Sequence, residues 1–302
     1  MYNTPILFLI FSRPDTTERV FQRIRAIKPS RLYVAADAPR DNRPDEAMRC
    51  AETRSIIERI DWDCELKTLY RDKNLGCKMA VSSAISWFFE QEEYGIILED
   101  DCLPDLSFFP YCEELLLRYK DDDRIGHISG NCFLPQYIPQ GQSYDFCSIS
   151  HIWGWASWRR VWKNYDVNFP FWYECKKNPA LLKSLFTNLR EEIYFSSFIS
   201  DALESSNGIH TWDVQYLYML RSQSQLSICP TVNLVTNIGL NSVGATHTSR
   251  KNKKLFVSSQ AAIFPLVHPM YVMSNAEMDK MTVKRSFFSY KRLLRYVINK
   301  LR

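Results

Sequence analysis

Three consecutive acidic residues, Glu99-Asp100-Asp101, follow directly after the apolar stretch 95–98. Adjacent carboxylates repel one another, so a fold places them at the end of a buried strand only where a positive charge compensates. Hard oxygen ligands suit Mg²⁺ or Mn²⁺, which keep several waters and share a site with substrate phosphates. We therefore expect this acidic cluster to bind Mn²⁺ or Mg²⁺. The alternative is an ordinary solvated acidic turn.

The elements that must position this cluster alternate between strand and helix along the first hundred residues. Such alternation predicts an α/β fold with a Rossmann-like, mostly parallel central sheet flanked by helices. Ligands of such sheets bind beyond the carboxyl ends of the strands. Arg13, Asp37 and Arg71 each follow a predicted strand, as the acidic cluster does. The predicted strands are 5–11, 32–36, 66–70 and 95–98, and the predicted helices are 16–27, 46–60, 77–91 and 106–119.

The acidic cluster and its surroundings resemble a known family. Glu99-Asp100-Asp101, followed by Leu103-Pro104-Asp105 and Phe108-Phe109, resembles the Asp-X-Asp metal motif of GT-A-fold glycosyltransferases. The similarity extends to the N-acetylglucosaminyltransferase I group and its bacterial relatives, and it covers residues 5–250. The motif departs from strict Asp-X-Asp, so the acid that touches the metal stays open. Other matching segments are Phe11-Ser12-Arg13-Pro14, Asp37, Ser227-Ile228-Cys229-Pro230 and Gly244-Ala245-Thr246-His247.

The resemblance implies a role for each donor-side residue. Asp101 would bind the metal directly, Asp100 would hold the ribose or sugar, and Glu99 would assist. Arg13 would meet the nucleotide or its phosphates, and Asp37 the base or ribose. Arg13 as a surface charge at a helix start and Asp37 in an Asx turn are the alternatives.

Two further residues are donor-side candidates. Lys78 could contact a phosphate, although a lysine in the first turn of a helix is commonly just exposed. His247 follows a glycine-containing loop and, by the resemblance, would reach the metal or the diphosphate, whereas a lone loop histidine is commonly structural. The glycines on both sides of the late loop, Gly239 and Gly244, suit a segment that closes over the donor.

A glycosyl transfer also needs a base that accepts the proton of the acceptor hydroxyl. Asp213, in Thr211-Trp212-Asp213, is the catalytic candidate, because it starts a predicted helix (211–222) whose dipole favours the ionised form, and because the family places its aspartate in a similar context. Simple helix capping is the alternative. Rival bases are Asp201, Glu204, Glu191 and Glu192, the last two on what reads as the exposed face of a helix within 179–206.

Aromatic residues are the candidates for the acceptor or sugar pocket, because their faces stack on the C–H surfaces of sugars. Trp153 and Trp155 flank a glycine and are assigned to the pocket, together with Trp212 and His151. Trp158 and Trp162 are spaced by four residues, which indicates helix core instead. The strand predicted at 226–235 is interrupted by Pro230.

Composition excludes several classes of protein. The chain has 302 residues, 46% hydrophobic and 24% charged, which excludes a disordered or collagen-like protein. Its longest apolar run, 5–11, is too short to cross a membrane, and no secretory signal is evident. Its nine cysteines are scattered without a CxxC pair, which favours reduced thiols. We expect a cytoplasmic protein at the inner face of the cell membrane.

Charge is distributed unevenly along the chain. Residues 280–302 contain eight basic residues and no acidic one, whereas the first 279 residues carry 30 basic and 34 acidic residues. In 284–302 apolar residues recur at helical spacing among the cations, which predicts a basic amphipathic helix on an anionic membrane surface. A terminal helix packed on the body is the alternative. Nucleic acid is not an expected partner, because the body is acidic and has no recognisable binding motif.

Together these observations predict three segments in one chain. Residues 1–120 would form the nucleotide-sugar-binding half, 121–265 the acceptor-binding half of the same GT-A domain, and 266–302 the basic tail. The expected function is metal-dependent, inverting transfer of a hexosyl or N-acetylhexosaminyl group from a nucleotide-sugar, taken as a UDP-sugar, to a surface glycan or lipid-linked oligosaccharide. A sugar nucleotidyltransferase and a non-catalytic glycan-binding relative are the alternatives. The Ser12–Asp15 loop contains no glycine, which counts against the first.

Overall fold

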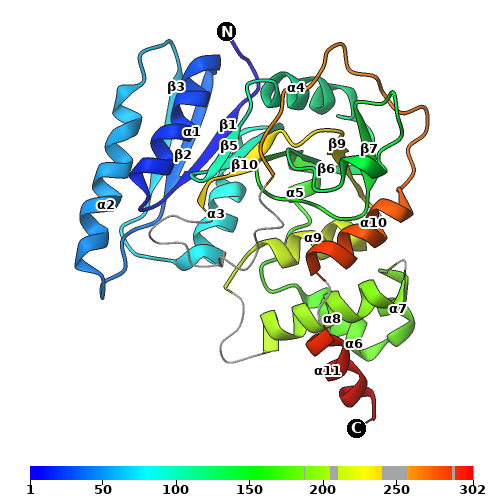
Figure 1. The fold of residues 1–302 in the computed structure, drawn as a ribbon. Coiled ribbons are helices and arrows are strands. Elements are labelled where there is room, and N and C mark those ends of the chain that lie inside the picture. The colour runs from blue at the N-terminus through cyan, green and yellow to red at the C-terminus, as the bar shows by residue number, and fades with distance from the viewer. Residues whose placement is uncertain (187, 205–209, 240–256, 288–289, 302) are drawn as a thin grey trace.

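The computed structural model shows a mixed α/β fold around one large sheet (Figure 1). It describes residues 1–186, 188–204, 210–239, 257–287 and 290–301. The eight strands lie in the order β3-β2-β1-β4-β8-β6-β9-β7, and four of the seven strand pairings are parallel. The predicted fold class is therefore confirmed. The strands are β1 (Ile6–Ile10), β2 (Arg31–Ala36), β3 (Glu65–Tyr70), β4 (Tyr94–Glu99), β6 (Ile125–Ser129), β7 (Tyr144–Cys147), β8 (Trp155–Trp158) and β9 (Leu226–Pro230).

Helices connect the parallel strands and cover the sheet. The chain moves outward from β1 through β2 to β3 and then returns past β1 to β4. Because such crossovers are right-handed, α1 and α2 cover one face and α3 the other. The helices up to β9 are α1 (Pro14–Ile27), α2 (Pro44–Ser55) with the 3₁₀ turn η1 (Ile56–Arg59), α3 (Gly76–Gln91), α4 (Phe108–Arg118), η2 (Pro135–Tyr137), α5 (Arg159–Trp162), α6 (Pro170–Lys177), α7 (Pro179–Ser184), α8 (Leu189–Glu204) and α9 (Asp213–Ser222).

A second, two-stranded sheet lies beside the acidic cluster. It pairs β5 (Cys102–Pro104) with β10 (Val235–Asn237) in antiparallel register. The strand predicted over 226–235 is thus two elements, because β9 ends at Pro230, whose ring removes a backbone donor. The chain closes with α10 (Ala276–Thr282), the π-helical turn η5 (Val283–Phe287) and α11 (Tyr290–Leu301).

Strand β8 is the element that the sequence analysis misplaced. Trp155 and Trp158 belong to a buried strand that pairs antiparallel with both β4 and β6, so the helical interpretation of Trp158 and Trp162 is wrong for Trp158. Trp162 does lie in a short helix, α5. Because β8 links β4 to β6, strands from both sides of residue 120 form one hydrogen-bonded sheet.

We expect Trp155→Ala to lower the free energy of unfolding by about 3–5 kcal/mol, because it empties a large buried site. Trp155 is 0% exposed and its ring stacks on Trp212 with centroids 5.6 Å apart. Denaturant unfolding followed by circular dichroism measures the loss. Trp153→Ala is the matched control and should cost clearly less, since Trp153 is only partly buried. Equal losses in the two variants would contradict the assignment of Trp155 to the core.

Candidate active site

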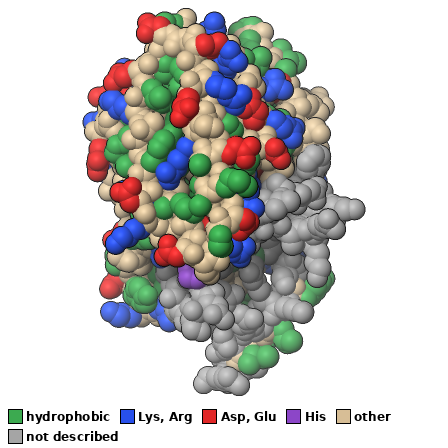
Figure 2. Space-filling view, turned by 90° about the vertical axis from the view of Figure 1, so that its left-hand side faces the viewer, with side chains coloured by type: hydrophobic (Ala, Val, Ile, Leu, Met, Phe, Trp, Pro, Cys, Tyr) green, Lys and Arg blue, Asp and Glu red, His purple; other side chains and the backbone are tan. Residues whose placement is uncertain are grey.

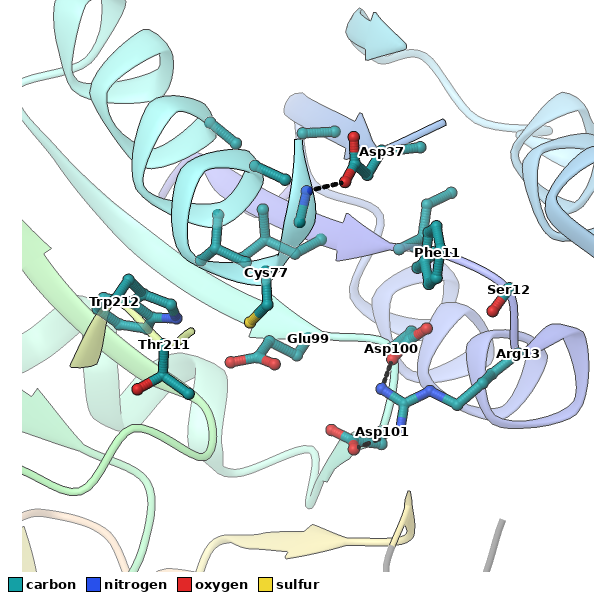
Figure 3. Close-up of a pocket in the computed structure, with 18 of the residues that line it drawn as sticks. Phe11, Ser12, Arg13, Asp37, Cys77, Glu99, Asp100, Asp101, Thr211 and Trp212 are labelled. Atoms are coloured by element: carbon teal, nitrogen blue, oxygen red, sulfur yellow. Dashed lines mark hydrogen bonds and ion pairs between the residues drawn. The ribbon is translucent and has the colours of Figure 1, made fainter. Parts of the chain in front are cut away.

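A cavity of about 500 Å³ opens at the carboxyl edge of β1, β2 and β4. It lies where the strand order reverses between β1 and β4, the position at which open α/β sheets bind ligands. One wall comes from α3 and another from the residues that lead into α9 (Figure 3). The candidate residues that line it are Arg13, Asp37, Glu99, Asp100, Asp101, Trp153, Trp212 and Asp213.

The acidic cluster is compensated by an arginine of the same chain. Arg13 Nη1 donates to Asp101 Oδ2 at 2.8 Å, and Arg13 Nη2 pairs with Asp100 Oδ1. Figure 3 shows the guanidinium between the two carboxylates. The strands bring these groups together, because β1 and β4 are parallel neighbours whose ends meet at one edge. Arg13 therefore supplies positive charge beside the cluster, while binding of a divalent cation stays a prediction.

One arginine does not balance three carboxylates. Burial first, and then the charges of Asp101 and Asp100, raise the pKa of Glu99 to about 8. Burial also raises the pKa of Asp100 to about 6, although Arg13 works in the opposite direction. Burial and mutual repulsion thus disfavour the ionised forms of Glu99 and Asp100, which a cation bound beside them would stabilise.

The donor set fits a hard divalent cation. Asp100 Oδ2 is buried without a hydrogen-bond partner, and Arg13 already occupies the adjacent position as a stand-in cation. Within the described part of the chain, no three His, Cys, Asp or Glu side chains form a ready ligand set. Mg²⁺ and Mn²⁺ do not require one, because they bind through one or two carboxylates together with substrate phosphates and water.

The backbone beyond β10 lies against this ion pair. Ile238 N donates to the carbonyl of Asp101 at 2.8 Å, and Gly239 N donates to Asn237 Oδ1 at 2.9 Å. A Cβ at Gly239 would lie 2.2 Å from Asp101 Oδ2 and 2.8 Å from Arg13 Nη1. Only glycine allows this approach. The predicted glycine loop therefore begins at the acidic cluster, while Gly244 and His247 lie outside the described residues.

Asp37 supports the wall formed by α3. Its Oδ1 accepts hydrogen bonds from Ala38 N and Leu75 N at 3.0 Å, and its Oδ2 accepts from Gly76 N at 3.0 Å. It therefore satisfies backbone donors at the first turn of α3, where the helix dipole favours a negative charge. Gly76, with φ of +74°, provides the left-handed backbone that this turn needs. The suggested contact of Asp37 with a base or ribose stays a prediction.

Asp213 is half-buried at the first position of α9 and lines the cavity. Its charge contributes to the raised pKa of Glu99, which places the two carboxyls within electrostatic reach. No hydrogen bond or ion pair is found for Asp213 with the residues that the structure describes. The residue before it, Trp212, is fixed by stacking on Trp155, and its carbonyl accepts from Tyr165 Oη at 3.2 Å. A rigid aromatic cluster thus holds a carboxylate toward the cavity.

Several candidates do not reach the cavity. Trp155 lies in the core, and His151 is buried with its ring edge-on to Phe133, 4.9 Å between centroids. Burial lowers the pKa of His151 to about 4, so its ring is neutral at pH 7. Lys78 lies on α3 outside the lining.

The rival bases are placed as follows. Glu191 and Glu192 are buried rather than exposed, which makes that expectation wrong. Glu191 pairs with Arg221, and Glu192 accepts from Tyr296 Oη at 3.0 Å, so tertiary partners cover the face of α8 that the sequence suggested was solvated. The side chains of Asp201 and Glu204 lie outside the described part of the chain.

Among the titratable side chains of the lining, four were not assigned a role from the sequence: Arg40, Arg71, Cys77 and His210. Arg40 pairs with the buried Glu46, and Arg71 Nη2 donates to Ser83 Oγ at 3.0 Å. Arg71 directly follows β3, a signal that the sequence offered. His210 directly precedes the Thr211–Asp213 segment, which already contains a site candidate. No feature of the sequence around Cys77 indicates a site residue.

Comparisons with known proteins show distant likeness in structure alone. No family model matches the chain, and no curated protein matches it by sequence. Among solved structures, apo-UDP-glucose pyrophosphorylase aligns with a TM-score of 0.36 and 7% identity over 74% of this chain and 90% of that one. HddC from Yersinia pseudotuberculosis aligns with a TM-score of 0.32 and 12% identity over 54% of this chain and 80% of that one. The 4-diphosphocytidyl-2C-methyl-D-erythritol synthase from Anaerococcus prevotii DSM 20548 aligns with a TM-score of 0.32 and 12% identity over 73% of this chain and 99% of that one. Likeness at this level carries no inference about the reaction.

We expect the metal-free protein to lose stability as pH rises from about 6.5 to 8.5. The pKa of Glu99 lies at about 8 in the folded chain, above its usual 4.5, so the stability linked to its bound proton is fully present below pH 4.5, declines as pH rises between these two values and is lost above about pH 8. The buried histidines His127 and His151, with pKa values of about 3 and 4, act in the opposite sense only below about pH 6.5. Thermal unfolding of wild type and Glu99→Gln over this range isolates the effect. Parallel curves for the two proteins would contradict it.

We expect Gly239→Ala to weaken Mn²⁺ binding at least about tenfold, a cost of about 1.4 kcal/mol, because the added methyl displaces the Asp101 carboxylate and Arg13. Isothermal titration calorimetry with MnCl₂ measures the affinity. Gly141→Ala is the control, because a Cβ at Gly141 meets no atom within 4 Å, although its positive φ brings some backbone strain. Unchanged Mn²⁺ affinity in the Gly239 variant would show that the approach of this backbone to Asp101 is irrelevant to the metal.

Proposed function

We propose that this chain is a metal-dependent transferase that binds a nucleotide-sugar in the cavity at the β1/β4 edge. One observation carries the proposal: Arg13 pairs with Asp100 and Asp101 beside the buried Glu99, at the point where the strand order reverses, and offsets only part of the charge of the three acids. Arg13 can bind the negatively charged diphosphate, and the acidic residues can bind the divalent cation. Burial of the acids makes their interaction with a cation stronger than it would be in water.

Each donor-side residue has a task in this proposal. Asp101 would ligate Mn²⁺ or Mg²⁺ with support from Asp100 and Glu99. When bound, the ion neutralises charge that develops on the departing diphosphate. Arg13, which donates to Asp101 in the structure, would then turn to the phosphates, because the metal ion would replace its positive charge beside this carboxylate. The hydrogen bond from Gly76 to Asp37 keeps the first turn of α3 in place, and the nucleoside would lie beside this turn.

Within this class we propose inverting glycosyl transfer. Asp213 would accept the proton of the acceptor hydroxyl on a carboxylate oxygen. In the same step the oxygen of that hydroxyl would form a bond to the anomeric carbon, and the bond between the anomeric carbon and the diphosphate would break. The half-buried position of Asp213 at the N-terminus of α9 and its lack of a partner among the described residues leave it available for this proton. Trp153, partly buried in the lining, offers a stacking face for a sugar. We propose a surface glycan or a lipid-linked oligosaccharide as acceptor.

Sugar nucleotidyl transfer is the second candidate. A basic residue directly after β1 is what such an enzyme would use on a nucleoside triphosphate, and Arg13 lies there. The names of the similar structures include pyrophosphorylases, although at those TM-scores the names decide nothing. Starting from a UDP-sugar, glycosyl transfer breaks the bond between the anomeric carbon and the diphosphate, whereas reverse nucleotidyl transfer breaks the bond between the two phosphates by attack of pyrophosphate. The products of the two reactions therefore distinguish them.

We expect Mn²⁺ together with one nucleoside diphosphate to raise the melting temperature more than either alone, and UDP-sugars with Mn²⁺ to release UDP. Nucleotidyl transfer would instead form UTP and a sugar phosphate, and only when pyrophosphate is added. Chromatography of the nucleotides distinguishes these outcomes. Asp101→Asn should abolish turnover and the Mn²⁺-dependent shift, because it removes the proposed ligand.

Asp213→Asn is the matched variant for the acceptor side. It should lower the rate of acceptor-dependent transfer by about 10²-fold or more while leaving nucleotide binding with Mn²⁺ unchanged. Glu174→Gln, an exposed carboxyl on α6, controls for loss of one negative charge. A chain that binds glycan but shows neither nucleotide-dependent stabilisation nor turnover would be a non-catalytic relative, and the proposal would fail.

A further inference from the structure

The C-terminal helix α11 (Tyr290–Leu301) presents two different faces. Its inner face packs on α8: Tyr296 Oη donates to Glu192 Oε1 at 3.0 Å, and Leu293 is partly buried. Its outer face carries Leu294, Val297 and Ile298, which are 62%, 44% and 44% exposed. At 100° per residue these three positions fall on one stripe of the helix. The helix is therefore anchored on one side and exposes an apolar stripe on another.

The sequence around this stripe is strongly basic. Residues 280–302 contain eight lysines and arginines and no acidic residue. Elsewhere cations are matched by acids: Figure 2 shows both signs interspersed over the face turned to the viewer, and the ion pairs around α1 and α2 include Arg25–Asp61 and Arg49–Asp45. The excess of positive charge is thus confined to the segment that bears the exposed stripe.

We propose that α11 docks on the surface of an anionic lipid bilayer, with Leu294, Val297 and Ile298 entering the headgroup boundary. An apolar stripe in a basic segment combines the two attractions that an anionic interface offers, burial of apolar area and charge complementarity. At 12 residues the helix is too short to cross a bilayer, and no helix in the described part of the chain is long and apolar enough to do so. The helix therefore lies on the surface. This inference does not depend on the reaction in the cavity.

The test is co-sedimentation of the full chain with vesicles. Wild type should bind vesicles of phosphatidylcholine with phosphatidylglycerol, bind pure phosphatidylcholine vesicles at least about tenfold less, and dissociate as salt increases. Leu294→Glu/Val297→Glu should lower binding to the anionic vesicles at least about tenfold. Met48→Glu is the matched control: Met48 is 72% exposed on α2, and its substitution should leave binding unchanged.

Folding controls and additional variants distinguish loss of membrane binding from misfolding and from binding through another surface. Circular dichroism and melting temperature show whether the double variant is folded, and Val297→Ser, which adds no charge, should weaken binding in the same direction. Met270→Glu tests a rival surface, since Met270 lies 84% exposed in the 263–273 segment. Equal binding to neutral vesicles, loss of binding in Met270→Glu alone, or a dimer in gel filtration that Val297→Glu converts to monomer would each overturn the proposal.

Discussion

The bridge from Arg13 to Asp100 and Asp101 is the interaction on which the candidate site depends. Three carboxyls at the end of a buried strand would repel one another and disfavour the folded chain without a nearby cation. Arg13 supplies that cation from the neighbouring strand, yet the raised pKa of Glu99 shows that compensation is incomplete. Arg13 therefore offsets only part of the negative charge, and a further cation would stabilise the ionised acids.

Contacts around the acidic cluster fix the positions of the two helices that begin at the rim of the cavity. The hydrogen bonds from Leu75 and Gly76 to Asp37 fix the start of α3. The stacking of Trp155 on Trp212 fixes the start of α9. Two helices thus begin at the rim of the cavity, each held by a contact with residues far away in the sequence. A small displacement of α9 would change the distance between the acidic cluster and Asp213, and a displacement of α3 would change the shape of the cavity wall.

Local patterns were sufficient for the first half of the sheet and for most of the cavity. Apolar runs ended by polar residues predicted β1, β2 and β4, and the rule that parallel strands end at one edge brought Arg13 to the acids. The same reasoning failed for features that depend on contacts between residues far apart in the sequence. Strand β8 is four residues long and rich in tryptophan, so no periodicity marks it. Glu191 looked solvated because Arg221, its partner, lies 30 residues away. Both carboxylate oxygens of Asp37 accept hydrogen bonds from backbone amides. These bonds depend on the position of α3, which the sequence around Asp37 does not determine.

Strand β8 also restricts how this molecule can move. It hydrogen-bonds to β4 on one side and β6 on the other, so the first and second halves of the chain are joined by continuous ladders rather than by a linker. A hinge rotation of one half against the other would have to break those ladders. The scaffold is for this reason mechanically stiff across the cavity, and adjustment to a bound molecule falls to side chains and connecting segments. A molecule that binds in this cavity would therefore meet a largely preformed site, with little reorganisation of the sheet.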